Sequence, residues 1–154
     1  MNALDFLKKE HEKAKGEFKK IEQASPGERA SLWTKLEPEL KVHERIEEAH
    51  LFGPIARDPK AKGTTLEDWD GHHSEEVGEA KDLIGILAGL DPSTDEWLDN
   101  VKELRSLLEH HIREEEDEIW PEIRRVWDAE QLDEAGTKME KDHAAKMEQM
   151  TRAS

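Results

Sequence analysis

The sequence predicts an all-α fold: an antiparallel up-down-up-down four-helix bundle with an additional C-terminal helix. Hydrophobic residues recur every three or four positions in four long segments, which is the period of an amphipathic helix. Short connections join these segments, as they do in antiparallel bundles. The chain of 154 residues has the length of one domain with a single core. We therefore expect a single domain over residues 1–154, with the bundle over about 1–126 and the C-terminal helix over about 129–151.

The first two helices are separated by the sequence ASPGE at residues 24–28. Ser25 is predicted to be the N-cap of the second helix, with Pro26 at its first position and Glu28 closing a capping box. Pro38 is expected to kink the second helix or to separate its first turns, because proline lacks an N–H group. The buried stripe of the first helix is Leu4, Leu7, His11, Ala14, Phe18 and Ile21, and that of the second is Leu32, Leu36, Leu40, His43, Glu47 and Leu51.

The third and fourth helices have similar boundary signals. A loop is predicted over residues 53–63, after which Thr64 or Thr65 can cap the third helix. Ser93 and Glu96 predict a capping box for the fourth helix, and Pro121 is expected to bend its end. The third stripe is Leu66, Trp69, His73, Val77, Ala80, Ile84 and Leu87, and the fourth is Trp97, Val101, Leu104, Leu108, His111, Glu115, Ile119, Ile123 and Val126.

The last segment has a weaker pattern than the other four. It carries apolar residues at wide intervals, and Gly136 interrupts it. We expect a fifth helix here that packs against the bundle. Its apolar residues are Leu132, Met139, Met147 and Met150.

The composition restricts the partners of the protein. With 38 acidic and 23 basic residues, the chain has a net charge of -15, which repels phosphate groups, so neither nucleic acid nor an anionic membrane is an expected partner. Cations and neutral small molecules are the expected ligands. There is no cysteine, so His, Asp and Glu must hold any metal. No apolar run approaches the roughly 20 residues that cross a bilayer, and the N-terminus does not resemble a signal peptide, so we interpret the protein as cytoplasmic.

Polar residues interrupt the buried stripes at equivalent places in the two halves of the chain. The sequences that follow His11 and His73 both have Gly five and Glu six residues later. Those that follow His43 and His111 share Glu four and five residues later and an aromatic residue nine residues later, and have Pro eleven and ten residues later, respectively. This pattern is typical of a duplicated helical hairpin, with one His on its first helix and His-x3-Glu on its second. Each His lies near the middle of its helix, so an antiparallel bundle can bring all of them into one layer.

Four histidines have Glu four residues later, and the face of the helix decides which of them are buried. His43 with Glu47 and His111 with Glu115 lie on apolar stripes. The other two pairs start at His72 and His110 and lie among polar residues, so we interpret them as solvated. Two further histidines, His50 and His143, follow Glu by three residues, as in ferritin-like sites, but that pattern is not repeated on two bundle helices. His143 is interpreted as a surface residue.

Four imidazoles and two carboxylates in an apolar core need a neutralising partner, because an unpaired buried charge costs several kcal/mol. Two divalent cations meet this need. We predict that His11 and His43 serve one ion and that His73 and His111 serve the other, with Glu47 and Glu115 shared between them. Mixed His and carboxylate ligation with open positions favours iron over calcium or magnesium, with manganese and zinc as alternatives.

The six residues resemble the hemerythrin-like, or HHE cation-binding, family, and specifically its H-HxxxE-H-HxxxE subgroup, over about residues 1–126. The resemblance implies an antiparallel bundle around two iron ions (Fe2+/Fe3+) that an oxo or hydroxo group bridges. Two positions depart from oxygen-carrying hemerythrin: Val77 stands where a further histidine is found, and His-x3-Glu replaces His-x4-Asp on the fourth helix. Glu116 stands at the His-x4 position and is an alternative to Glu115.

These departures put reversible oxygen carriage in doubt. Relatives with the present pattern look more like proteins that decompose peroxide or react with nitric oxide. The prediction is therefore a di-iron protein, a monomer or weak homodimer, that reacts with hydrogen peroxide, dioxygen or nitric oxide, foremost by catalase-like decomposition of peroxide. The alternative is a non-enzymatic module that binds, stores or senses iron or oxygen.

Residues around the predicted ligands have less specific roles. Glu44, Glu48 and His50 are candidates for an outer layer that supports the ligands. Phe52 and Trp120 occupy equivalent positions in the two halves and are interpreted as core packing. Trp69, one turn before His73, is interpreted mainly as packing, with lining of the pocket as the alternative.

Overall fold

The computed structural model describes residues 1–153 and, over that range, is helical apart from short connections. Five long helices dominate it, as predicted. The long helices are α1 (Ala3–Gln23), α2 (Pro26–Glu47), α4 (Thr65–Ala88), α5 (Asp95–Glu114) and α7 (Ala129–Ala153), and the short elements are η1 (Glu48–Phe52), α3 (Gly53–Ala56), η2 (Pro59–Ala61), η3 (Glu115–Ile119) and α6 (Trp120–Val126).

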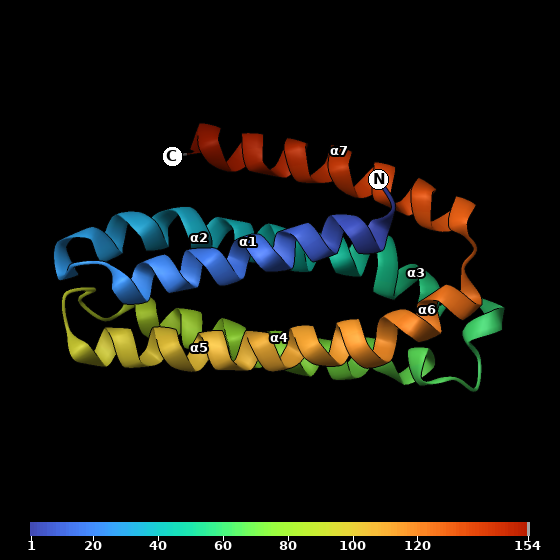
Figure 1. The fold of residues 1–154 in the computed structure, drawn as a ribbon, viewed down its shortest axis with the longest axis horizontal. Helices are drawn as coiled ribbons and strands as arrows, with labels where there is room; N and C mark the ends of the chain where they lie inside the picture. Colours follow the sequence, from blue (N-terminus) through green and yellow to red (C-terminus); the bar gives the residue numbers. More distant parts are fainter. Residues whose placement is uncertain (154) are drawn as a thin grey trace.

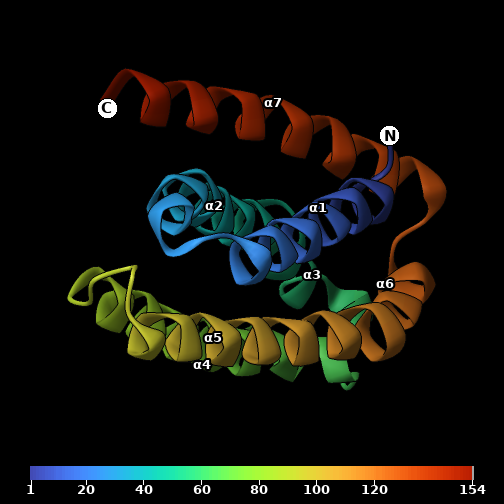
Figure 2. The same cartoon turned by 60° about the vertical axis from the view of Figure 1, so that its left-hand side comes forward.

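The helices form three layers (Figures 1 and 2). The α1/α2 pair packs antiparallel, and the α4/α5 pair lies below it in Figure 1 with the same up-down order. Helix α7 returns across the outer face of α1 and α2, away from α4 and α5. The predicted fold class, a four-helix bundle with an additional C-terminal helix, is confirmed.

The N-terminal ends of α2 and α5 differ from the two predicted capping boxes. Ser25 is the N-cap of α2, but its side chain makes no capping hydrogen bond. The N-cap of α5 is Thr94, whose hydroxyl accepts a hydrogen bond from the backbone N–H of Trp97 at 3.2 Å, while the Ser93 hydroxyl donates to Asp91. Thr64 caps α4 as predicted. Because Ser and Thr are adjacent, the sequence placed the start of α5 one residue early.

One of the two predictions for Pro38 is corrected by the structure. Pro38 lies inside α2, which is continuous from Pro26 to Glu47, so the predicted separation of its first turns is wrong. The region predicted as a loop over 53–63 contains two short helical elements, α3 and η2. Among residues 1–153, Gly63, with a φ of 82°, is the one position with the left-handed backbone that suits glycine.

Helices α2 and α5, which carry the histidines of the His43–Glu47 and His111–Glu115 motifs, each continue into one turn of π-helix. In η1 the N–H of Gly53 donates to the carbonyl of Glu48, and in η3 the N–H of Trp120 donates to the carbonyl of Glu115. A proline follows each of these turns in α3 and α6, and it has no N–H for a regular helical bond. Single π turns are uncommon and often lie at functional sites.

The core is divided into two hydrophobic clusters, which corrects the expectation of a single core. The clusters lie toward opposite ends of the bundle, and the predicted layer of His and Glu lies between them along the helices. The first cluster is built around Leu4, Leu7, Val42, Ile46, Leu51, Phe52, Leu66, Trp69, Trp120 and Ile123, and the second around Phe18, Ile21, Leu36, Leu87, Trp97, Val101 and Leu104.

Helix α7 is fixed to the bundle near the first cluster. Gly136 allows its backbone to touch the start of the chain, since an added Cβ would lie 2.0 Å from the carbonyl oxygen of Met1. The glycine that interrupts the sequence pattern is thus a packing position inside a continuous helix. His50 of η1 and Asp142 of α7 are also joined, with Nε2 and Oδ2 2.7 Å apart.

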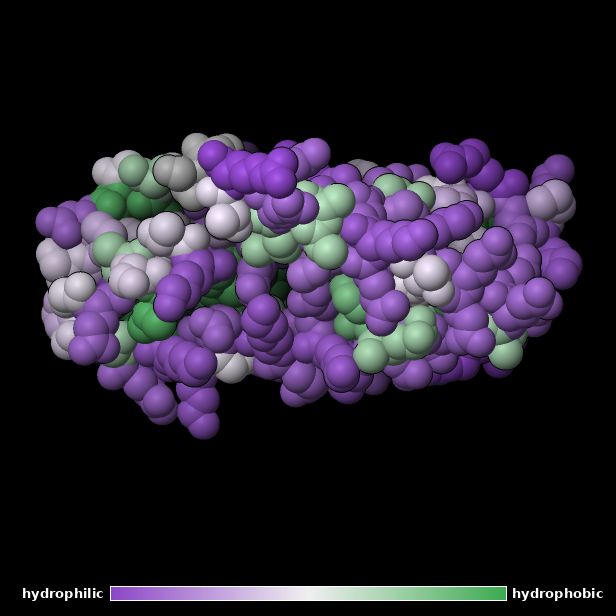
Figure 3. Space-filling view, turned by 90° about the horizontal axis from the view of Figure 1, so that it is seen from above, coloured by the Kyte–Doolittle hydropathy of each residue, from purple (hydrophilic) through white to green (hydrophobic). Residues whose placement is uncertain are grey.

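The surface agrees with the acidic composition. Seen from above in Figure 3, hydrophobic side chains form separate patches on a mostly hydrophilic face. Within residues 1–153, no helix combines the length and apolar character that a bilayer crossing requires.

Candidate metal centre

The four bundle helices bring the six predicted ligands to the interior between the two hydrophobic clusters. His11 comes from α1, His43 and Glu47 from α2, and His73 from α4. His111 is near the end of α5, and Glu115 begins the π turn η3. Five of the six are buried, with Glu115 0% and Glu47 1% exposed, and the side chain of His43 is 19% exposed.

The donor atoms form two groups that share one carboxylate. Atoms of His11, His43 and Glu47 lie within 4.8 Å of one another, and so do atoms of Glu47, His73 and His111. The ring centroids within each histidine pair are 5.0 Å (His11 to His43) and 4.9 Å (His73 to His111) apart. This is the pairing of histidines that the sequence predicted, with Glu47 between the pairs.

Glu115 also lies between the two pairs. Its Oε1 is 3.7 Å from Nε2 of His11, and its Oε2 is 3.0 Å from Nε2 of His111. Glu116, the alternative to Glu115, turns outward, where it accepts a hydrogen bond from Lys8 at 2.6 Å. The geometry therefore favours Glu115 as the carboxylate that the fourth helix contributes.

Two carboxylates contact the outer nitrogens of the predicted ligands. Oε2 of Glu116 is 2.7 Å from Nδ1 of His11, and Oε2 of Glu76 is 2.8 Å from Nδ1 of His111. Such contacts fix the ring orientation and leave Nε2 directed inward, as in many metal sites. Sequence reasoning missed both roles, because it treated Glu116 as a competing ligand and placed Glu76 on a solvated face.

The residues predicted for the outer layer lie elsewhere. Glu48 is beside Asp70, and its burial and that neighbour raise its pKa to about 7. His50 contacts Asp142 of α7 and not the six predicted ligands. Glu44 lines the cavity described below.

Aromatic rings form the walls of the layer. Trp69 stacks on His111 with ring centroids 5.9 Å apart, so it lines the site as well as packing in the core. Trp120 stacks on His11 at 5.6 Å, and Phe52 meets His73 edge-on at 4.7 Å. Phe52 and Trp120 thus belong to the core, as predicted, and each also restricts a histidine from the other half of the chain.

Burial and mutual proximity shift the titration of the layer. Burial lowers the pKa of His11 to about 3 and that of His73 to about 4, so both rings are neutral at pH 7. Burial and the neighbouring Glu47 raise the pKa of Glu115 to about 7. For His111, burial acts to lower the pKa, but contacts with Glu115 and Glu76 outweigh it and raise the pKa to about 11.

Several polar atoms of the layer lack a partner within the described residues. Nε2 of His11, Oε2 of Glu47 and Oε1 of Glu115 are buried and make no hydrogen bond to protein. Buried polar atoms are rarely left unpaired, because each costs about 1–3 kcal/mol. Imidazole nitrogens and carboxylate oxygens that converge in this way fit metal ions, and the residues present are suited to hold them.

The comparisons with known proteins agree with this geometry. The model of the hemerythrin HHE cation-binding domain matches residues 2–123. The chain belongs to this family. A crystal structure of an HHE cation-binding domain-containing protein of Mycobacterium kansasii, an Rv2633c homolog, has a TM-score of 0.80 and 28% sequence identity to this HHE domain, and the match covers 95% of this chain and 87% of the other.

The names of two curated relatives do not mention this family. The uncharacterized protein Rv2633c of Mycobacterium tuberculosis is 31% identical over 154 residues, which cover 97% of this HHE domain and 88% of that protein. A protein of Nostoc sp. named DNA nickase is 28% identical over 138 residues. The match covers 89% of this HHE domain but only 38% of the nickase, so the likeness concerns less than half of that protein.

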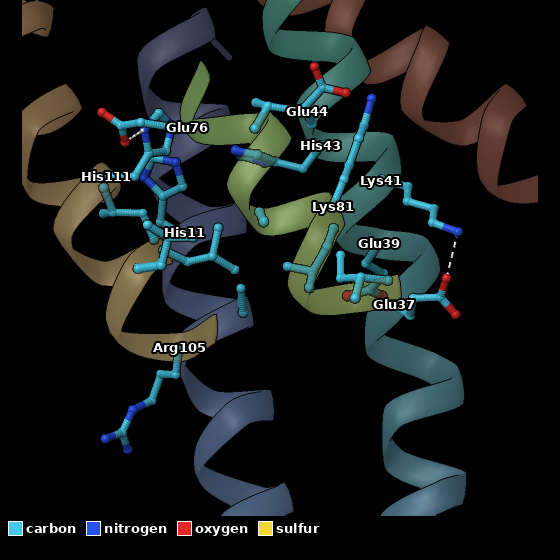
Figure 4. Close-up of a pocket in the computed structure, with 18 of the residues that line it drawn as sticks. His11, Glu37, Glu39, Lys41, His43, Glu44, Glu76, Lys81, Arg105 and His111 are labelled. Atoms are coloured by element: carbon cyan, nitrogen blue, oxygen red, sulfur yellow. Dashed lines mark hydrogen bonds and ion pairs between the residues drawn. The ribbon is translucent and has the colours of Figure 1, made fainter. Parts of the chain in front are cut away.

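A cavity of about 510 Å³ adjoins the layer in this HHE domain. Figure 4 shows His11, Glu76 and His111 on one side of it and His43 on the other. In the same view Lys81 lies beside His43, and Lys41 and Glu37 form an ion pair farther from His11. The apolar part of the lining is made by Ala14, Phe18, Leu40, Val77, Ala80, Ile84 and Leu108.

Proposed function

We propose that this HHE domain holds two iron ions with His11, His43, Glu47, His73, His111 and Glu115, and that it decomposes hydrogen peroxide. The observation that carries the proposal is the pair of donor groups joined by Glu47, with buried nitrogen and oxygen atoms that no group of residues 1–153 satisfies by a hydrogen bond. When bound, iron would supply a redox couple and open positions for a small ligand. Two molecules of peroxide then yield two of water and one of oxygen, so no external reductant is needed.

The protein side chains have three tasks in this proposal. Glu116 and Glu76 hold His11 and His111 through their outer nitrogens, so the inner nitrogens keep a fixed direction. Glu47 and Glu115 bring negative charge between the two pairs of histidines. Trp69, Trp120 and Phe52 surround the layer with apolar rings, which limits access of water.

The cavity provides access for a small neutral ligand. Hydrogen peroxide, dioxygen and nitric oxide are uncharged, so neither the net charge of -15 nor the apolar lining opposes their entry. Dioxygen and nitric oxide are alternative ligands with the same access. Oxygen carriage is not preferred, because Val77 stands where oxygen-carrying hemerythrin has a further histidine. Relatives with the present pattern look more like proteins that decompose peroxide or react with nitric oxide, and we take peroxide as the first of these.

The proposal is tested by metal analysis, an optical spectrum and oxygen evolution. Iron-loaded protein should hold two ions per chain, absorb in the near ultraviolet, where oxo-bridged ferric pairs absorb, and evolve oxygen steadily from peroxide. His111→Ala should lose all three properties. His143→Ala is the matched control, since His143 pairs with Glu10 at 2.9 Å outside the centre and should leave them unchanged. Intact iron-loaded protein that loses iron with little turnover would contradict the enzymatic proposal.

A second candidate function is a non-enzymatic module that senses or stores iron or oxygen. The favouring observation is the contact of His50 with Asp142, because His50 lies in the π turn that follows Glu47 and Asp142 lies in α7. Binding of a metal ion by Glu47 would then act on α7 through the contact between His50 and Asp142. Limited proteolysis of residues 129–154 with and without iron tests this function, and equal protection in both states would argue against a switch.

A further inference from the structure

Two His-x3-Glu motifs that the sequence assigns to solvated faces lie side by side in the structure. His72 and Glu76 are on α4, and His110 and Glu114 are on α5. The antiparallel packing of these helices brings the motifs together. His72 contacts Glu76, and its Nε2 is 3.3 Å from Oε2 of Glu114. Nε2 of His110 is 2.9 Å from Oε1 of the same Glu114.

This cluster has the donor chemistry of a transition-metal site. Donor atoms of His72, Glu76 and Glu114 lie within 4.8 Å of one another, which one ion can span. The carboxylates of Glu76 and Glu114, with oxygens within 4.8 Å of each other, repel unless a cation or a proton lies between them. His110 contacts the second oxygen of Glu114 and fixes the direction of that carboxylate, as supporting residues do in metal sites.

We propose that His72, Glu76 and Glu114 form a third metal site, which takes a divalent transition-metal ion. One imidazole and two carboxylates leave positions for water, and the side chain of His72 is 47% exposed, so an ion can enter and leave directly from solvent. The site shares no residue with the six predicted ligands of the centre, and its existence does not depend on the proposed reaction.

The position of Glu76 suggests what the third site does. Its Oε2 is 2.8 Å from Nδ1 of His111, and its side chain lines the same cavity as His11, His43 and Glu47. One carboxylate therefore faces an ion site open to solvent and a residue of the buried centre. We infer that incoming ions bind first at the third site and then pass along the cavity to the buried layer.

Counting bound Co2+ tests the site, because Co2+ binds His and carboxylate ligands and its visible spectrum reports coordination. His72→Ala should hold one ion fewer per chain than the parent protein, and Glu114→Gln should do the same. His110→Ala should keep the ion but weaken its binding about 10–100-fold, the range for loss of a supporting residue. His143→Ala is the matched control, because His143 is half-buried between α7 and α1, where it contacts Glu10 at 2.9 Å, and this variant should hold as many ions as the parent.

A chain with a disrupted centre separates this proposal from the proposed function. The triple variant Glu47→Gln, His73→Ala and Glu115→Gln, which removes both shared carboxylates, should retain one Co2+ ion, and adding His72→Ala should remove it. Equal ion counts for the parent and His72→Ala would overturn the third site, whatever the centre binds. Iron loading of the centre should be slower in His72→Ala than in His143→Ala, and equal loading rates would overturn the entry role.

Discussion

Neighbouring residues can have opposite roles in this centre, and Glu115 and Glu116 are the clearest example. Each step along a helix rotates the side chain by about 100°, so two adjacent carboxylates cannot face the same side. Glu115 faces inward between His11 and His111. Glu116 faces outward, but it reaches back to Nδ1 of His11. We therefore expect both residues to matter for metal binding, for different reasons.

Substitution of Glu116 should weaken metal binding without removing a ligand. In Glu116→Ala, His11 loses its outer contact, and the affinity of the centre for Fe2+ should fall about 10–100-fold. Glu115→Gln removes a predicted ligand and should cost more than Glu116→Ala. The measurement is equilibrium competition with a chromophoric chelator. Glu118→Ala, an exposed change on the same turn, is the control, and a loss equal to that of Glu116→Ala would contradict the assigned role.

Metal loading should release protons, chiefly from His111. With a pKa of about 11, this imidazole keeps its proton at pH 7 when no ion is bound, and Glu115, with a pKa of about 7, is partly protonated. A metal ion displaces these protons, so the apparent affinity should rise as the pH increases from 6 to 8. Calorimetric titration in two buffers of different ionisation enthalpy measures the release. His11 and His73 are already neutral, and an affinity that does not vary with pH would contradict this account.

The six predicted ligands could be identified from the sequence because a polar residue that interrupts an apolar stripe can be recognised without a structure. It did not reach Glu76 or Glu116 as supporting residues. Both lie on polar faces of their helices, and their roles depend on which helix packs beside them. The same reason explains His72 and Glu114, whose separate motifs look solvated until α4 and α5 are packed together.

At the level of elements, the glycine of α7 is a contact point between the C-terminal helix and the start of α1. Helix propensity alone identifies Gly136 as an interruption, since glycine disfavours helices. In the structure, α7 is continuous, and the backbone of Met1 to Ala3 lies where a side chain at position 136 would be. The sequence predicted the fifth helix but not this contact, because such a contact involves backbone atoms that any residue has.

Gly136→Ala should therefore destabilise the protein although alanine favours helices. The added methyl group would lie 2.0 Å from the Met1 carbonyl oxygen, and overpacking of this kind costs about 1–3 kcal/mol of unfolding free energy. The matched control is Gly78→Ala in α4, where nothing lies within 4 Å, and this change should stabilise by about 0.5–1 kcal/mol. Urea unfolding followed by circular dichroism measures both, and a stabilised Gly136→Ala variant would show that the N-terminus does not pack as described.

At the level of the whole molecule, a polar layer divides the hydrophobic core. A bundle with this design has weaker cohesion at its centre than at its two apolar ends, because the layer contains unpaired buried atoms. Composition and periodicity were sufficient to predict the bundle, since burial of apolar stripes determines how the helices pack. The polar positions on the four stripes predicted a shared layer, but not that this layer separates two hydrophobic clusters.

Metal ions should accordingly stabilise the entire fold. A ligand that binds only the folded state adds about 2.7 kcal/mol of unfolding free energy when its free concentration is 100 times its Kd. The melting temperature should therefore rise on loading with Fe2+ and fall again when a chelator is added, as scanning calorimetry would record. In His73→Ala, which lacks one predicted ligand, the rise should be smaller, and an equal rise would mean that the ions bind elsewhere.

The two π turns bear on the history of the chain. A π turn contains one residue more than an ordinary helical turn, and η1 and η3 stand just after, or at, the Glu of the two His-x3-Glu motifs. If both halves descend from a single ancestral hairpin, one residue inserted in that ancestor would account for both turns. The turns now differ by one position relative to the Glu, so the two arms have diverged in register as well as in most side chains.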